Sequence, residues 1–77
     1  MEKVLVLNYV DNDSFCRPVY ENDGKLFVDV DPLSDCKPNI CTKMYNHFNG
    51  EPDTSIQDMK EYEGMQVKFS PKRIVWR

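Results

Sequence analysis

An Asp-Gly dipeptide between two extended segments is the feature that most restricts how this chain folds. Residues 25–31 alternate between apolar and polar side chains, and residues 15–20 have an extended pattern before the dipeptide. Asp23 and Gly24 suit the positive φ angles of a tight hairpin turn. The sequence therefore predicts a hairpin over 15–31, with Asp29 and Asp31 on its solvated face. Pro18 cannot donate a ladder hydrogen bond, so its strand is expected at a sheet edge, or with the proline nitrogen facing outward.

Most other segments also favour β structure. Residues 3–10, 66–69 and 73–76 are predicted strands, and residues 11–14 form a polar turn. The segment 40–48 is ambiguous, because Ile40, Met44 and Phe48 share one face of either a strand or a helix. Thr42 and Tyr45 favour the extended form. Overlapping capping patterns at 54–58 predict one or two helical turns across 55–63.

These elements predict one small domain over residues 1–77. A chain of 77 residues holds only a small core. The expected fold is mainly β, a curled antiparallel sheet or partly open barrel with one short helix near 55–63. Helical structure at both 40–48 and 55–63 would instead give an α+β fold.

Composition points to an intracellular protein. The longest apolar run spans residues 4–7, whereas a membrane helix needs about 20 residues. The chain has three cysteines, and an odd number argues against a disulfide framework. We therefore expect no membrane association, a cytoplasmic location and reduced cysteines.

The residues with metal-binding or nucleophilic side chains give weak signals. Cys16, Cys36, Cys41 and His47 could fill a tetrahedral zinc shell, but they lack the close cysteine pair of most zinc sites, so scattered reduced cysteines are the simpler interpretation. Cys41 and His47 are the only local pair for cysteine catalysis, and in an extended strand they lie about 20 Å apart. We expect neither an enzyme nor a bound cofactor.

A basic and aromatic C-terminal segment suggests one binding function. Residues 1–59 hold five basic and eleven acidic residues, whereas residues 60–77 hold five and two. Cations beside an aromatic ring can bind single-stranded nucleic acid, and the candidates are Lys68, Lys72, Arg73, Trp76 and Arg77. The acidic body disfavours this function. In the simpler interpretation, Trp76 closes the core and its neighbours solvate the sheet edge.

Protein binding is the leading functional hypothesis. Aromatic residues make up 12% of the chain, more than a small core can bury, so some are expected at the surface. Exposed aromatic side chains or a β edge would hold another protein or a second copy of the chain. Residues 17–20, 23–26, 42–43 and 48–53 resemble small uncharacterised bacterial domains, including parts of mobile-element and phage proteins. The resemblance implies no activity and no site residues.

Overall fold

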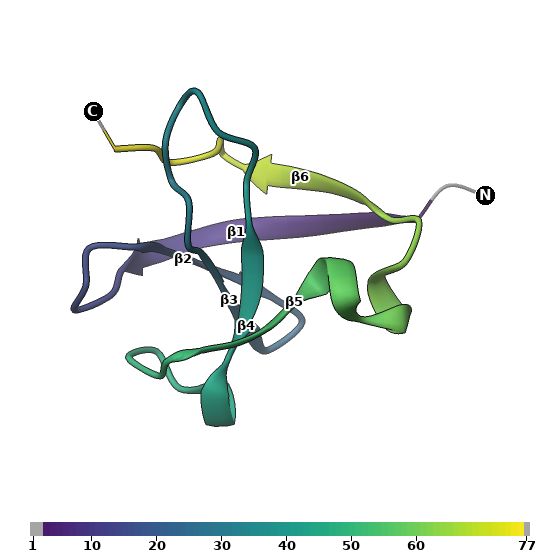
Figure 1. Cartoon of the computed structure of the whole chain (residues 1–77), viewed down its shortest axis with the longest axis horizontal. Helices are drawn as coiled ribbons and strands as arrows, with labels where there is room; N and C mark the ends of the chain where they lie inside the picture. Colours follow the sequence, from purple (N-terminus) through teal and green to yellow (C-terminus); the bar gives the residue numbers. More distant parts are fainter. Residues whose placement is uncertain (1–2, 77) are drawn as a thin grey trace.

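The computed structural model describes residues 3–76 as one curled sheet of six strands (Figure 1). Their spatial order is β5-β4-β3-β2-β1-β6, and β5 does not pair with β6, so the sheet stays open. The mainly β fold is confirmed. The strands are β1 (Val4–Asn12), β2 (Pro18–Asn22), β3 (Lys25–Asp29), β4 (Ile40–Lys43), β5 (Pro52–Ser55) and β6 (Gln66–Ser70).

The sheet is mixed rather than wholly antiparallel. The strands from β1 to β5 pair antiparallel in chain order, but β6 runs parallel to β1, with Val4 opposite Gln66. Parallel pairing needs a long crossover connection, and residues 13–65 supply it by forming the rest of the fold.

The predicted hairpin is confirmed, with one correction. Asn22 pairs with Lys25, and the turn residues Asp23 and Gly24 have φ angles of 51° and 82°. These are the positive values that a tight hairpin turn requires. The edge position expected for Pro18 is wrong, because β2 lies between β1 and β3. Pro18 is instead the first residue of its strand, where a missing donor is tolerated.

Three short 3₁₀ turns, η1 (Met44–Asn46), η2 (Ile56–Asp58) and η3 (Lys60–Tyr62), complete the fold. The last two confirm the helical turns predicted near 55–63, and the Ser55 hydroxyl accepts a hydrogen bond from the Gln57 N–H at 3.3 Å. The segment 40–48 is extended only through Lys43. Residues 3–76 contain no α-helix, so the α+β alternative is wrong. The short 3₁₀ turns of these residues are not long and apolar enough to cross a membrane.

The strand predicted over 73–76 is replaced by an irregular tail. Only Trp76 forms a bridge, to Leu33. The backbone N–H of Ile74 donates to the Tyr20 hydroxyl at 2.9 Å, and that of Trp76 donates to the Pro32 carbonyl at 2.6 Å. Residues 71–76 therefore do not extend the sheet. They are held by hydrogen bonds to Tyr20 of β2 and to the 30–39 loop.

The core draws on four strands and one 3₁₀ turn. It is formed by buried side chains from β1, β2, β3, β4 and η2: Leu5, Leu7, Tyr20, Phe27, Ile40 and Ile56. Side chains of β6 and of the segment before it pack against this cluster but stay only partly buried. The core is consequently least covered where the open sheet leaves a gap.

Candidate functional site

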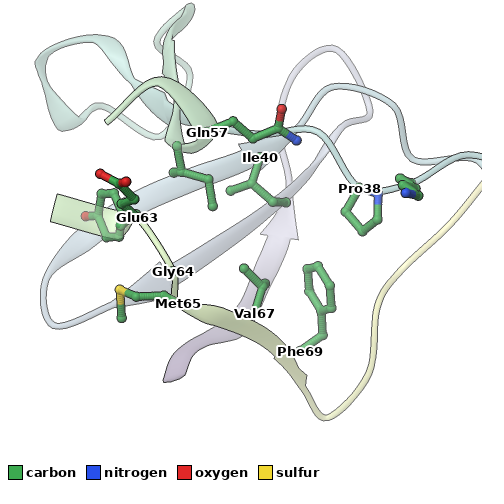
Figure 2. A pocket seen from close by; sticks show the side chains of 11 residues that line it. Pro38, Ile40, Gln57, Glu63, Gly64, Met65, Val67 and Phe69 are labelled. Atoms are coloured by element: carbon green, nitrogen blue, oxygen red, sulfur yellow. The ribbon is translucent and has the colours of Figure 1, made fainter. Parts of the chain in front are cut away.

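An open groove lies beside β6, where the curled sheet fails to close. Its volume is about 540 Å³, within the range of ligand-binding sites. β6 forms one wall, and η2 with the start of β4 forms the other (Figure 2). The lining residues are Lys37, Pro38, Ile40, Ile56, Gln57, Tyr62, Glu63, Gly64, Met65, Val67 and Phe69.

The floor of the groove is the edge of the hydrophobic core. Val67 and Phe69 project from β6 into the same space as Ile40 of β4 (Figure 2). Ile40 is buried, whereas Val67 and Phe69 are only half-buried although they pack against the core. The rings of Phe69 and Tyr20 also pack at an angle of 58°, with 5.0 Å between their centroids. A ligand in the groove would therefore complete the burial of a surface that the fold has already positioned.

The backbone of β6 presents hydrogen-bonding groups at the same place. The Gln66 N–H donates to the Lys3 carbonyl at 3.0 Å, so the backbone groups of Gln66 face β1. Alternate residues of a strand direct these groups to opposite sides, so the N–H and C=O groups of Val67 and Phe69 face away from β1. No strand of residues 3–76 lies on that side of β6. The two residues that line the groove thus also carry the open edge.

Lysines dominate the charge around β6. Lys68 is exposed on the outer face of the strand, opposite Val6 of β1, and Lys72 follows the strand. Pro38 and Glu63 lie at opposite ends of the groove (Figure 2), and the exposed Lys37, which precedes Pro38, also lines it. The ion pairs within residues 3–76 do not include any of these three lysines.

Of the residues proposed for nucleic-acid binding, Trp76 is exposed and Arg73 is partly buried. Arg73 is also bonded within the fold: its guanidinium donates to the Asp29 carboxylate at 3.3 Å and to the Cys36 carbonyl at 2.8 Å. The Trp76 indole N–H donates to the Cys16 carbonyl at 2.6 Å, which fixes the ring. Lys68 and Lys72 are exposed, and Arg77 lies outside the described residues.

The cysteines and the histidine do not converge. Cys16, Cys36 and His47 are exposed, and Cys41 is buried in β4. Residues 3–76 contain no group of three side chains arranged to hold a metal ion. Burial, followed by the charge of Asp29, raises the pKa of the Cys41 thiol, which makes it a poor nucleophile.

Thiol labelling should separate the buried cysteine from the two exposed ones. In the native protein we expect a maleimide reagent to modify Cys16 and Cys36, and to modify Cys41 at least tenfold more slowly, because burial restricts access and keeps the thiol protonated. Peptide mass spectrometry over a time course measures the three rates. The same labelling in urea is the control, since unfolding should make the three labelling rates similar. Equal rates in the native protein would contradict the burial of Cys41.

Two carboxylates that the sequence predicts to be solvated are buried in the structure. Asp13, expected in an exposed turn, accepts a hydrogen bond from the Lys43 ammonium at 2.6 Å, and neither side chain is exposed. Burial acts to raise the pKa of Asp13, but the hydrogen bonds from Lys43 and from the N–H groups of Arg17 and Phe15 outweigh it and lower this pKa. Lys43 also donates to the Gly50 carbonyl at 3.1 Å. These bonds tie loops together rather than activate a nucleophile.

The solvated face predicted for Asp29 is also wrong, because its side chain is fully buried. One carboxylate oxygen accepts from the backbone N–H groups of Asp31 and Asn39, and the other accepts from Arg73. Every oxygen of this carboxylate therefore has a structural partner. Asp31, by contrast, is exposed as expected.

Comparisons with protein-family models, curated proteins and solved structures find no match for this chain.

Proposed function

We propose that this chain is a non-enzymatic protein-interaction module that binds an extended segment of another protein along β6. The observation that carries the proposal is the coincidence of an open strand edge with an apolar groove. Val67 and Phe69 supply both, through outward backbone groups and side chains that line the groove. Strand addition uses this arrangement, in which every second residue of an edge strand offers free backbone groups while its side chain helps to form a pocket.

An added strand would continue the curl of the sheet. Its backbone would hydrogen-bond to Val67 and Phe69, and every second side chain would enter the groove opposite Ile40 and Ile56. Backbone bonds of this kind supply affinity without sequence preference, while the side chains in the groove supply specificity. The apolar floor makes aliphatic or aromatic side chains the best fit.

The nucleic-acid hypothesis has less support. Single-strand binding relies on a cationic groove with an aromatic platform. Arg73, one of the proposed cations, is paired with Asp29, although the Trp76 ring is exposed. The remaining exposed cations, Lys68 and Lys72, lie beside the β6 edge, where they serve a protein ligand equally well.

A proline at position 67 tests the proposed edge directly. Val67→Pro removes an N–H that faces away from β1, so the β1–β6 ladder should persist while binding at the edge weakens at least tenfold. The probes are seven-residue peptides selected on the wild-type protein from a random display library, with affinities measured by NMR titration. Val67→Thr is the matched control, because it keeps the N–H and the branched shape.

The same titrations contain the outcomes that would contradict the proposal. Amide shifts of the wild-type protein should cluster at β6, η2 and the start of β4. Selected peptides that shift other surfaces, or that bind Val67→Pro as tightly as wild type, would exclude the β6 edge. If the NMR spectrum of Val67→Pro shows that this variant is unfolded, the shift map of the wild-type protein still shows whether the peptides bind at β6.

A further inference from the structure

We infer that the segment bound at β6 carries an acidic residue between two apolar ones, with the acidic side chain opposite Lys68. This inference rests on the proposed function and specifies the chemistry of the partner. It follows from three features of β6. Its side chains alternate between an inner and an outer face, its outer face carries the positive charge of Lys68, and this charge would repel the Lys68 of a second copy of the chain.

The alternation fixes which partner side chains meet which surface. Val67 and Phe69 lie on the inner face of β6, because they pair in parallel with the buried residues Leu5 and Leu7. Lys68, between them, shares the outer face with Val6. A strand added to the edge alternates with the same period, so two of its side chains enter the groove while the one between them lies beside Lys68.

The charge of the outer face selects the middle residue. Lys68 is exposed and forms no ion pair with a carboxylate of residues 3–76, and its outer-face neighbours on β6 are the uncharged Gln66 and Ser70. An acidic residue directly across from a lysine is a favourable cross-strand pair, whereas a basic residue there is repelled. Lys37 and Lys72, near the far end of β6, add to the attraction for an acidic segment.

The same lysine disfavours a second copy of this chain as the occupant. Antiparallel pairing of two β6 edges, with Val67 of each copy opposite Phe69 of the other, would place the two Lys68 side chains directly across from each other. Like charges in that position are destabilising, and an edge lysine commonly prevents edge-to-edge association. A different protein segment with the opposite charge meets no such repulsion, and we take it as the occupant.

Three matched peptides test the inference. Each is acetylated, amidated and seven residues long, with the sequence Thr-Thr-Val-X-Val-Thr-Thr and glutamate, glutamine or lysine at X. We expect the glutamate peptide to bind about threefold more tightly than the glutamine peptide at low salt, and the lysine peptide to bind most weakly. The difference should shrink in 0.5 M NaCl because exposed charges are screened.

A charge reversal then assigns the effect to one residue. Lys68→Glu should invert the order, so that the lysine peptide binds most tightly. Lys60→Glu is the matched control, because it makes the same charge change at an exposed position on η3 outside the groove lining, and it should preserve the wild-type order.

The outcomes distinguish this inference from the proposed function. Equal binding of the three peptides at β6 would overturn the charge rule and leave the edge proposal standing. Failure of all three peptides and of the library-selected peptides would overturn both. Amides of Val67 and Phe69 that are protected from exchange in a dimer of the unliganded protein would identify a second copy as the occupant and overturn the inference.

Discussion

Replacing Lys43 by methionine is expected to lower the free energy of unfolding by about 3–5 kcal/mol. Lys43 and Asp13 form an ion pair with 2.6 Å between nitrogen and oxygen, and both side chains are fully buried. Methionine keeps most of the side-chain volume but leaves the Asp13 carboxylate without its buried cation. A chain of this length is stabilised by roughly 4–12 kcal/mol, so the loss is a large part of the total.

Urea unfolding followed by tryptophan fluorescence measures this loss. Lys25→Met is the control, because Lys25 pairs with Glu61 at the surface, where both side chains are more than half exposed. That substitution should change the stability by less than about 1 kcal/mol. Similar effects of the two substitutions would contradict the burial of the Lys43–Asp13 pair.

Asp29→Ala should destabilise the fold by about 3 kcal/mol, with its largest effect on the C-terminal tail. The substitution removes the acceptor of the Asp31 and Asn39 N–H groups and the partner of Arg73. The penalty is smaller than for a fully enclosed pair, because Arg73 is partly exposed and can turn toward water.

Two measurements separate the global from the local effect. Urea unfolding gives the total loss, and native-state hydrogen exchange at Ile74 and Trp76 reports the release of the tail. The control is Asp53→Ala, at an exposed carboxylate, which should leave both unchanged. A normal exchange rate at Ile74 in Asp29→Ala would show that the Asp29–Arg73 pair does not hold the tail.

Local sequence signals predicted the local structure. The Asp23–Gly24 turn and the Ser55 cap depend on residues within a few positions of each other, and both occur in the structure. Capping patterns locate the start of a helical turn but do not determine its type, and the turns near 55–63 are 3₁₀. The direction of β6 in the sheet follows from its pairing with β1. No pattern within residues 66–69 indicates that β1 is the strand with which they pair.

The buried carboxylates and the groove were unpredictable for the same reason. Asp13 lies 30 positions from Lys43, and Asp29 lies 44 positions from Arg73, so their sequence neighbourhoods suggest only solvated acids. The groove combines residues from the 37–40, 56–65 and 67–69 segments. Sequence reasoning led to the hypothesis that a β edge binds a partner, and it included Lys68 among candidates for a different ligand, nucleic acid. It did not single out β6, the edge that we propose.

The parallel pairing of β1 with β6 also has a kinetic consequence. Val4 must find Gln66 across nearly the whole chain, so the entropy of closing this loop opposes the contact until the intervening hairpins have formed. During synthesis β1 emerges before the other five strands, and a nascent chain that ends before residue 66 exposes the side of β1 that β6 later covers. We therefore expect β1 to gain its second neighbour last, and we expect the incomplete chain to be open to misassociation until β6 pairs with it.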